Sequence, residues 1–349
     1  MSTAFPTAAR RVAMAAIAAA MTTAAAAAPL YRIQKLDRPD GIEPEHATAI
    51  SSTGIIVGYG RTPDEASLAP YIRKRHKTLP LEQPGVLTRV WSVNARGEVA
   101  GESDGHAFRW DAAGHAIDMD ALASCKGEPG SKTSRATSIN DAGTVTLVAQ
   151  CRVAGVWQEK GFVVHGHQAT ELPDFGDHRS YASAVNNHDQ VAGSSVLAAN
   201  ADGYTFRRAL RWQDGDTTDL GTGGGCCSHA TAINDLGHVT LNSDDETSHE
   251  RLYVSDGHTL HKLFNCNKRY PLVAAAINNH DVVIANTDGT GVGYLFEQGH
   301  CHQFTDLMDD SGEGWSMMTL HGINDDGVVV GEGVLNKHWR AFIATPVSR

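Results

Sequence analysis

The segment Thr137-Ser-Ile-Asn-Asp-Ala-Gly-Thr-Val-Thr-Leu147 contains the pattern that decides the fold. A short run of small and β-branched residues ends at Asn140, a polar turn ends at Gly143, and a second strand-like run follows. An Asn side chain can bond its own backbone, and Gly accepts the positive φ that a tight hairpin requires. The segment therefore predicts two antiparallel strands joined by a short turn.

The same pattern recurs seven times between residues 47 and 331, with spacings of 43, 46, 46, 48, 44 and 46 residues. Each copy continues into a third strand that pairs a small residue with an aromatic residue or Leu, and most then show a Gly turn and a fourth strand. A period in the forties built from short strands is typical of propeller blades. We therefore predict an all-β, seven-bladed β-propeller. The turns of the seven copies begin at Ser51, Asn94, Asn140, Asn186, Asn234, Asn278 and Asn324.

The two ends of the repeat array complement each other. The seventh copy stops shortly after Ala344 and has no fourth strand, whereas Leu30–Leu36 has the fourth-strand pattern without three strands before it. Pairing these segments would leave no open sheet edge between the first and last blades. We therefore expect residues 28–349 to form a single domain of four-stranded blades, each of about 46 residues, with an N-terminal strand completing the last blade.

The first residues have the features of a secretory signal peptide. Arg10 and Arg11 precede a short apolar stretch and a run of alanines, which predicts a cleaved signal at residues 1–27. No second apolar run of membrane length follows, so we expect no membrane insertion after cleavage. The formal net charge of −11 argues against nucleic acid as a partner. We expect an exported monomer, periplasmic or extracellular.

Three features resemble one known family. They are the string Gly105-His-Ala-Phe-Arg-Trp110, the repeated Ile/Val-Asn-x-x-Gly turns and the string Asp219-Leu-Gly-Thr-Gly-Gly224. The chain resembles the bacterial extracellular HAF-repeat proteins over about residues 30 to 345. The resemblance implies export and a propeller-like β fold, and it implies no particular activity.

The six cysteines of an exported chain are expected to form disulfides. Cys125 and Cys151 belong to the same end of the third blade, so we predict that they are bridged. Cys226 and Cys227 are adjacent, and either form a vicinal bridge or supply a partner for Cys266. We expect Cys301 at the opposite end of its blade, and its pairing stays open.

No motif for a familiar propeller chemistry occurs. The chain lacks a sialidase box, a Gly-x-Ser-x-Gly elbow and a repeat typical of quinone cofactors. The runs His165-Gly-His167 and His300-Cys-His302 have a spacing that suits zinc, but each lacks a third ligand. We therefore predict no catalytic residue, no metal site and no cofactor, with calcium on the central axis kept as an alternative.

Loop lengths indicate which face binds. The Asn turns are uniform, and the length variation falls on the opposite end, in residues 61–68, 122–135, 194–205 and 307–318. Binding residues concentrate on variable loops carried by a rigid scaffold. We therefore predict a ligand face at that end, with Trp315 as an exposed aromatic anchor. The predicted contact residues are Trp315, His46, His178, Arg179 and His229.

Three functions remain open at this stage. The favoured one is an exported binding propeller that presents its loop-rich face to a protein or glycan partner. The second is a carbohydrate-active or other hydrolytic enzyme with carboxylates at the channel mouth, and the third is a structural envelope protein. Carboxylates that converge with an Arg or His near the channel would favour catalysis.

Overall fold

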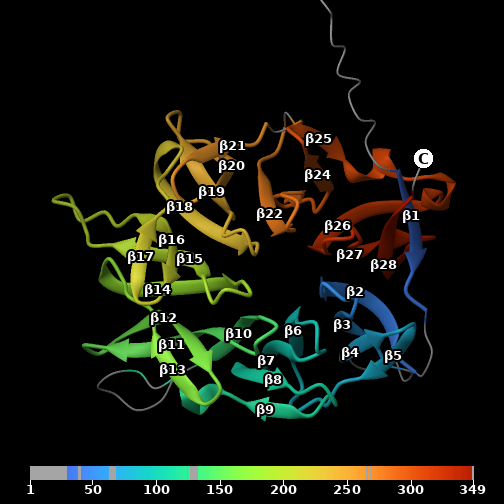
Figure 1. Cartoon of the computed structure of the whole chain (residues 1–349), viewed down its shortest axis with the longest axis horizontal. Coiled ribbons are helices and arrows are strands. Elements are labelled where there is room, and N and C mark those ends of the chain that lie inside the picture. The colour runs from blue at the N-terminus through green and yellow to red at the C-terminus, as the bar shows by residue number, and fades with distance from the viewer. Residues whose placement is uncertain are drawn as a thin grey trace, which may run out of the picture.

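The computed structural model describes residues 30–37, 41–62, 68–123, 125, 133–264, 266–267 and 269–347. Seven antiparallel four-stranded sheets stand side by side in a ring around a central axis (Figure 1). The predicted seven-bladed β-propeller is thereby confirmed. The predicted signal peptide, residues 1–27, lies outside the described residues. Among those residues, no helix has both the length and the apolar character needed to cross a membrane.

The strands occupy equivalent places in every blade (Figure 1). The first strands border the central axis: β2 (Glu43–Ile50), β6 (Thr88–Val93), β10 (Ser134–Ile139), β14 (Gly176–Val185), β18 (Gly224–Ile233), β22 (Leu272–Ile277) and β26 (Trp315–Ile323). The second strands follow: β3 (Ile56–Arg61), β7 (Val99–Ser103), β11 (Val145–Val153), β15 (Val191–Leu197), β19 (Val239–Asp245), β23 (Val283–Thr287) and β27 (Val329–Leu335).

The third strands are β4 (Leu68–Lys74), β8 (His106–Trp110), β12 (Val156–His165), β16 (Arg207–Gln213), β20 (Glu250–Ser255), β24 (Gly293–Glu297) and β28 (His338–Val347). The outermost strands are β5 (Lys77–Pro80), β9 (Ala116–Asp118), β13 (Gln168–Glu171), β17 (Asp216–Asp219), β21 (Leu260–Lys262), β25 (His300–Gln303) and β1 (Leu30–Lys35). Three short 3-10 helices lie in the connections: η1 (Asp120–Leu122), η2 (Phe304–Leu307) and η3 (Asp310–Gly312).

The N-terminal strand completes the last blade, as the sequence predicts. β1 pairs antiparallel with β28, with Ile33 opposite Ala344. Tyr31 and Ile33 are buried in the same cluster as Phe342, so the last blade is held together by residues from both ends of the chain. The outer edge of blade seven is therefore supplied by the N-terminal segment.

Each first strand carries a β-bulge shortly before its turn, as the shifts in register show. The bulge pushes a backbone carbonyl toward the second strand. A Cβ at Gly58 would lie 1.9 Å from the carbonyl oxygen of His46, and a Cβ at Gly193 equally close to that of Tyr181. Gly58 and Gly193 therefore cannot carry a side chain without a shift of the backbone, whereas Leu147, Leu241 and Ala285 occupy the equivalent position beside the bulge in blades three, five and six.

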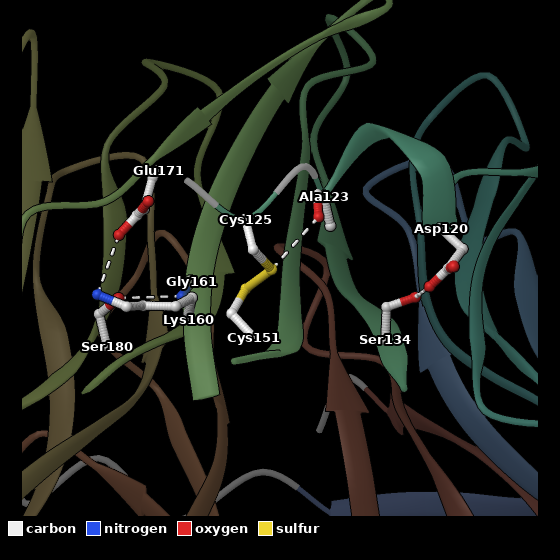
Figure 2. Close-up of a disulfide and its surroundings, with 9 residues drawn as sticks. All are labelled: Asp120, Ala123, Cys125, Ser134, Cys151, Lys160, Gly161, Glu171 and Ser180. Atoms are coloured by element: carbon white, nitrogen blue, oxygen red, sulfur yellow. Dashed lines mark hydrogen bonds and ion pairs between the residues drawn. A yellow bond between two sulfur atoms is a disulfide. The ribbon is translucent and has the colours of Figure 1, made fainter. Parts of the chain in front are cut away.

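The disulfide predicted in blade three is present (Figure 2). The Cα atoms of Cys125 and Cys151 are 5.5 Å apart, and the bridge ties the connection before β10 to β11. Nearby, the buried Lys160 forms ion pairs with Glu171 and Asp174 at 3.0 and 3.2 Å. Two cross-links, one covalent and one ionic, therefore hold the outer part of this blade.

The prediction for the other cysteines is wrong. Cys266 forms a disulfide with Cys301, and Cys226 and Cys227 are free thiols. Cys301 lies on β25, the outermost strand of blade six, and the connection that enters this blade brings Cys266 within bonding distance. The path of that connection in space, which the sequence does not specify, decides the pairing.

Candidate functional site

From blade two to blade six, the Asn residue of each turn bonds its blade to the next one. Its side-chain oxygen accepts from its own turn, as Asn140 does from Thr144 N–H at 2.9 Å. Its amide nitrogen donates to the backbone carbonyl of the next Asn around the ring, as Asn140 does to Asn186 at 2.9 Å. The same bond links Asn94 to Asn140, Asn186 to Asn234, Asn234 to Asn278 and Asn278 to Asn324.

A second ring of polar residues follows the first. Asp141, Asn187, Asp235, Asn279 and Asp325 alternate from blade to blade, and each side-chain oxygen accepts from a backbone N–H of the preceding blade. The Asn and Ile/Val residues of the turns line an axial cavity of about 160 Å³ together with this ring. Because these oxygens already accept protein hydrogen bonds, the ring joins neighbouring blades without an ion. Calcium on the axis stays a prediction.

The opposite face carries the longer loops, but the predicted contact residues are not on them. All five lie on the innermost strands: His46 on β2, His178 and Arg179 on β14, His229 on β18 and Trp315 on β26. These strands border the central axis (Figure 1). The sequence predicted the correct end of the blades for these residues, but it placed them in loops, whereas they lie on strands.

Trp315 is not an exposed loop tip, so that part of the prediction is wrong. It is the first residue of β26 and is half-buried. Its ring meets that of Phe342 edge to face, with centroids 5.7 Å apart. The glycines around it end a connection that runs directly into the strand, and the indole is drawn into the core of blade seven. A role for Trp315 in binding stays a prediction.

His46 belongs to a polar cluster at the seam between blades one and seven. Its Nδ1 pairs with the carboxylate of Glu332 on β27, and Nε2 of His321 lies 3.3 Å from the same carboxylate oxygen. The ring of His46 stacks on Tyr59 at 4.4 Å. Tyr71 donates to the carbonyl of His46 at 2.9 Å. A half-buried carboxylate is thus held between two imidazoles.

The charge state of Glu332 follows from these contacts. Burial on its own would raise the pKa of Glu332, but the hydrogen bonds from His321 and His46 outweigh it and lower the pKa to about 2. The carboxylate is therefore ionised across the physiological range. Burial, reinforced by the charge of Glu332, raises the pKa of the neighbouring Tyr59 phenol.

A cleft of about 440 Å³ adjoins this cluster. Glu45 precedes His46 on β2, and it has no register partner because Pro44 pairs with Gly60 and His46 with Tyr59. That irregularity turns Glu45 toward Arg61, whose guanidinium contacts both of its carboxylate oxygens at 3.0 and 3.4 Å. The cleft is lined by Glu43, Glu45, Arg61, Thr62, Lys337, His338, Trp339 and Arg340.

The far wall of the cleft is the start of β28. Arg340 pairs with Glu43 at 3.1 Å, and Trp339 keeps 42% of its surface exposed. Arg340 precedes Ala341, the register partner of Glu332, so the cleft and the histidine cluster share strands. Sequence reasoning missed this cleft. The strings Glu43-Pro-Glu45 and His338-Trp-Arg340 were the available signal, but they are about 290 residues apart.

The remaining predicted residues lie on blades four and five. His178 is exposed beside Asp174, and Arg179 bonds Asp177 at 2.5 Å. On β18, burial and the charge of Arg207 lower the pKa of His229, against the opposing effect of Asp244. Arg207 itself lies 4.4 Å above the ring of Tyr181. No contact joins these residues to the seam cluster among the described residues, so the five do not form one site.

Comparisons with known proteins bear on the fold alone. No family model and no curated protein matches the sequence. The β-propeller domain of the Trilobed protease from Pyrococcus furiosus is similar in structure, with a TM-score of 0.57 at 11% identity over 89% of this chain and 97% of that chain. Virginiamycin B lyase from Staphylococcus aureus is also similar, with a TM-score of 0.56 at 11% identity over 91% and 99%.

These relationships define the class of protein. The chain is a seven-bladed β-propeller, and proteins of several different functions share that fold. Identities near 11% show that the architecture is shared, and they do not indicate a shared activity. The function must therefore be argued from the seam between blades one and seven.

Proposed function

We propose that this chain is an exported binding propeller that holds a carbohydrate in the cleft between blades one and seven. The observation that supports this most directly is the composition of the cleft. It combines a half-exposed indole, Trp339, with carboxylates and guanidinium groups that are fixed in place by pairing. A flat aromatic surface stacks on a sugar ring, and fixed polar groups bond its hydroxyls in defined directions.

The volume of the cleft and the ion pairs along its walls both suit a carbohydrate ligand. A volume of about 440 Å³ falls in the range of small-molecule sites. The pair Arg340–Glu43 joins the two walls and the pair Arg61–Glu45 fixes the blade-one wall, so that little side-chain entropy is lost on binding. Because the cleft carries charges of both signs, a neutral or zwitterionic saccharide suits it better than a strongly charged ligand.

Two disulfides fit an oxidising compartment. We place the protein in the periplasm or outside the cell, as a monomer related to the HAF-repeat proteins. This placement rests on the N-terminal sequence and the repeated turns. A protein partner in place of a glycan is the main competing ligand.

Glycan-array screening of the purified mature chain tests the proposal, followed by titration of any hit. Trp339→Ala should weaken binding about tenfold or more, because it removes the stacking surface. Trp157→Ala is a matched control. Trp157 is 45% exposed and lies at the start of β12, the place in blade three that Trp339 occupies in blade seven. Equal losses in both variants, or no glycan bound, would contradict the proposal.

A second candidate, a hydrolase, is favoured by the His46–Glu332–His321 cluster. A histidine held by an ionised carboxylate can act as a general base. Against a two-carboxylate glycosidase, both acids of the cleft, Glu45 and Glu43, are paired with the guanidinium groups of Arg61 and Arg340. Incubating the chain with the sugars and esters that bind, and finding turnover that Glu332→Gln abolishes, would establish this candidate over simple binding.

A further inference from the structure

In the innermost strand of blade five, β18, the pairing register is interrupted over three residues, two of which are cysteines. Gly224 pairs with Asp245, and the next register pair is Ser228 with Ser243. Three residues of β18, Gly225, Cys226 and Cys227, therefore lie opposite one residue of β19, Asp244. Bulges of this kind redirect side chains, and here both thiols are brought to the same carboxylate.

The three groups are close enough to share a ligand. The Sγ atoms of Cys226 and Cys227 and a carboxylate oxygen of Asp244 all lie within 4.8 Å of one another. Cys226 Sγ is 3.2 Å from Asp244 Oδ2. Cys226 is exposed, and the other two residues are half-buried, so an ion can reach them from solvent. The four other cysteines are consumed in disulfides, whereas these two are free.

We propose that Cys226, Cys227 and Asp244 bind one zinc-type divalent cation, with the fourth coordination position left to water. Two thiolates and one carboxylate are a ligand set that zinc accepts, whereas calcium and magnesium prefer oxygen ligands alone. On binding, each thiol releases one proton, so the complex carries two thiolates and one carboxylate around a 2+ ion. This site is on blade five and is independent of the seam cleft.

His229 lies two residues beyond Cys227 on β18, opposite Asn242 of β19. The imidazole is not one of the three close ligand groups. A His229→Gln variant should therefore weaken metal binding less than loss of a thiol does.

Cobalt is a suitable probe, because bound thiolates give Co²⁺ an intense near-ultraviolet charge-transfer absorption. The mature protein, reduced mildly enough that mass spectrometry still shows both disulfides, should take up one Co²⁺ per chain and release it to zinc. Cys226→Ser with Cys227→Ser should abolish the thiolate absorption. Asp244→Asn should weaken the cation at least about tenfold. Glu246→Gln, which removes an exposed carboxylate two residues away, should leave affinity unchanged.

Each other outcome would overturn the proposal. It fails if the wild-type chain shows no thiolate band at millimolar Co²⁺, or if the double serine variant retains the site. It also fails if Cys226 and Cys227 of the exported protein are found joined in a vicinal disulfide, since the thiols would then be unable to ligate. Thermal melts of each variant without metal distinguish a lost ligand from a misfolded blade.

Discussion

The side-chain amide of Asn140 donates to the backbone carbonyl of Asn186 at 2.9 Å, across the boundary between blades three and four. The two residues occupy the same position in consecutive repeats, 46 residues apart. From blade two to blade six, the residue that defines each repeat in the sequence is therefore also the residue that joins it to the next. Five such bonds join blades two to seven in series, because one side chain has both an acceptor for its own turn and a donor for its neighbour.

Replacing one of these residues should weaken the whole ring. Asn140→Ala leaves Thr144 N–H and the Asn186 carbonyl without their partner in a buried place, which costs about 2 kcal/mol or more of unfolding free energy. Asn200→Ala is the control, because Asn200 is exposed and its side chain accepts only from its own turn. It should cost less than about 1 kcal/mol. Urea unfolding curves measure both, and equal effects would contradict a role between blades.

The N-terminal strand should be needed for closure of the ring. Ile33→Asp places a charge in the buried cluster of blade seven and should lower the melting temperature by more than about 5 °C. Gln34→Asp changes an exposed residue of the same strand and should have little effect. Deleting residues 28–37 should expose the seam and promote aggregation. A truncated chain that melts unchanged and stays monomeric would show that β1 is dispensable.

The Glu332 cluster should lose its contribution to stability in acid. The pKa of Glu332 is lowered from 4.5 to about 2 in the folded chain, so its stabilisation is complete above pH 4.5 and declines as the pH falls toward 2. The wild type should therefore be more stable than Glu332→Gln at pH 7, and the difference should shrink between pH 4.5 and pH 2. Unfolding curves at several pH values measure it. A difference that grows on acidification would have the wrong sign.

The disulfide pattern can be read directly by non-reducing peptide mapping. We expect Cys125 linked to Cys151 and Cys266 linked to Cys301, with Cys226 and Cys227 alkylated in the unreduced protein. Removing the first bridge with the double substitution Cys125→Ala and Cys151→Ala should lower the free energy of unfolding by about 3 kcal/mol, because the bridge closes a loop of 26 residues. Cys266 linked to Cys226 or Cys227 would contradict the structure.

Much of the architecture could be predicted because it depends on local chemistry repeated seven times. Strand period, the Asn and Gly of the turns and the incomplete last copy are all visible along the chain, and each agreed with the others. The bridge between Cys125 and Cys151 could be predicted for the same reason, because both residues belong to one blade. The pairing of Cys266 with Cys301 could not be predicted, because it depends on the path in space of the connection that enters blade six.

Most of the candidate site could not be predicted from the sequence. Glu332, His321 and Trp339 come from the end of the chain, and their partners His46, Glu45 and Arg61 from near its beginning. No spacing rule links residues so far apart. The exposed role predicted for Trp315 was wrong because a glycine-rich flank was taken as a loop tip, whereas the backbone enters β26 at that residue.

The sequence by itself determined the number of blades and the strand order within each, because hairpins are formed by neighbours along the chain. It also determined the strand that closes the ring, because the last copy lacks a fourth strand and the N-terminal segment has that pattern. Only the tertiary structure decided which side chains meet across blades. The seam cleft, the imidazole-held Glu332 and the thiols facing Asp244 each depend on ring closure or a bulge in register. The first two contacts are set by packing between whole sheets, whose geometry no single repeat contains, and the third is set by an interruption of register within blade five.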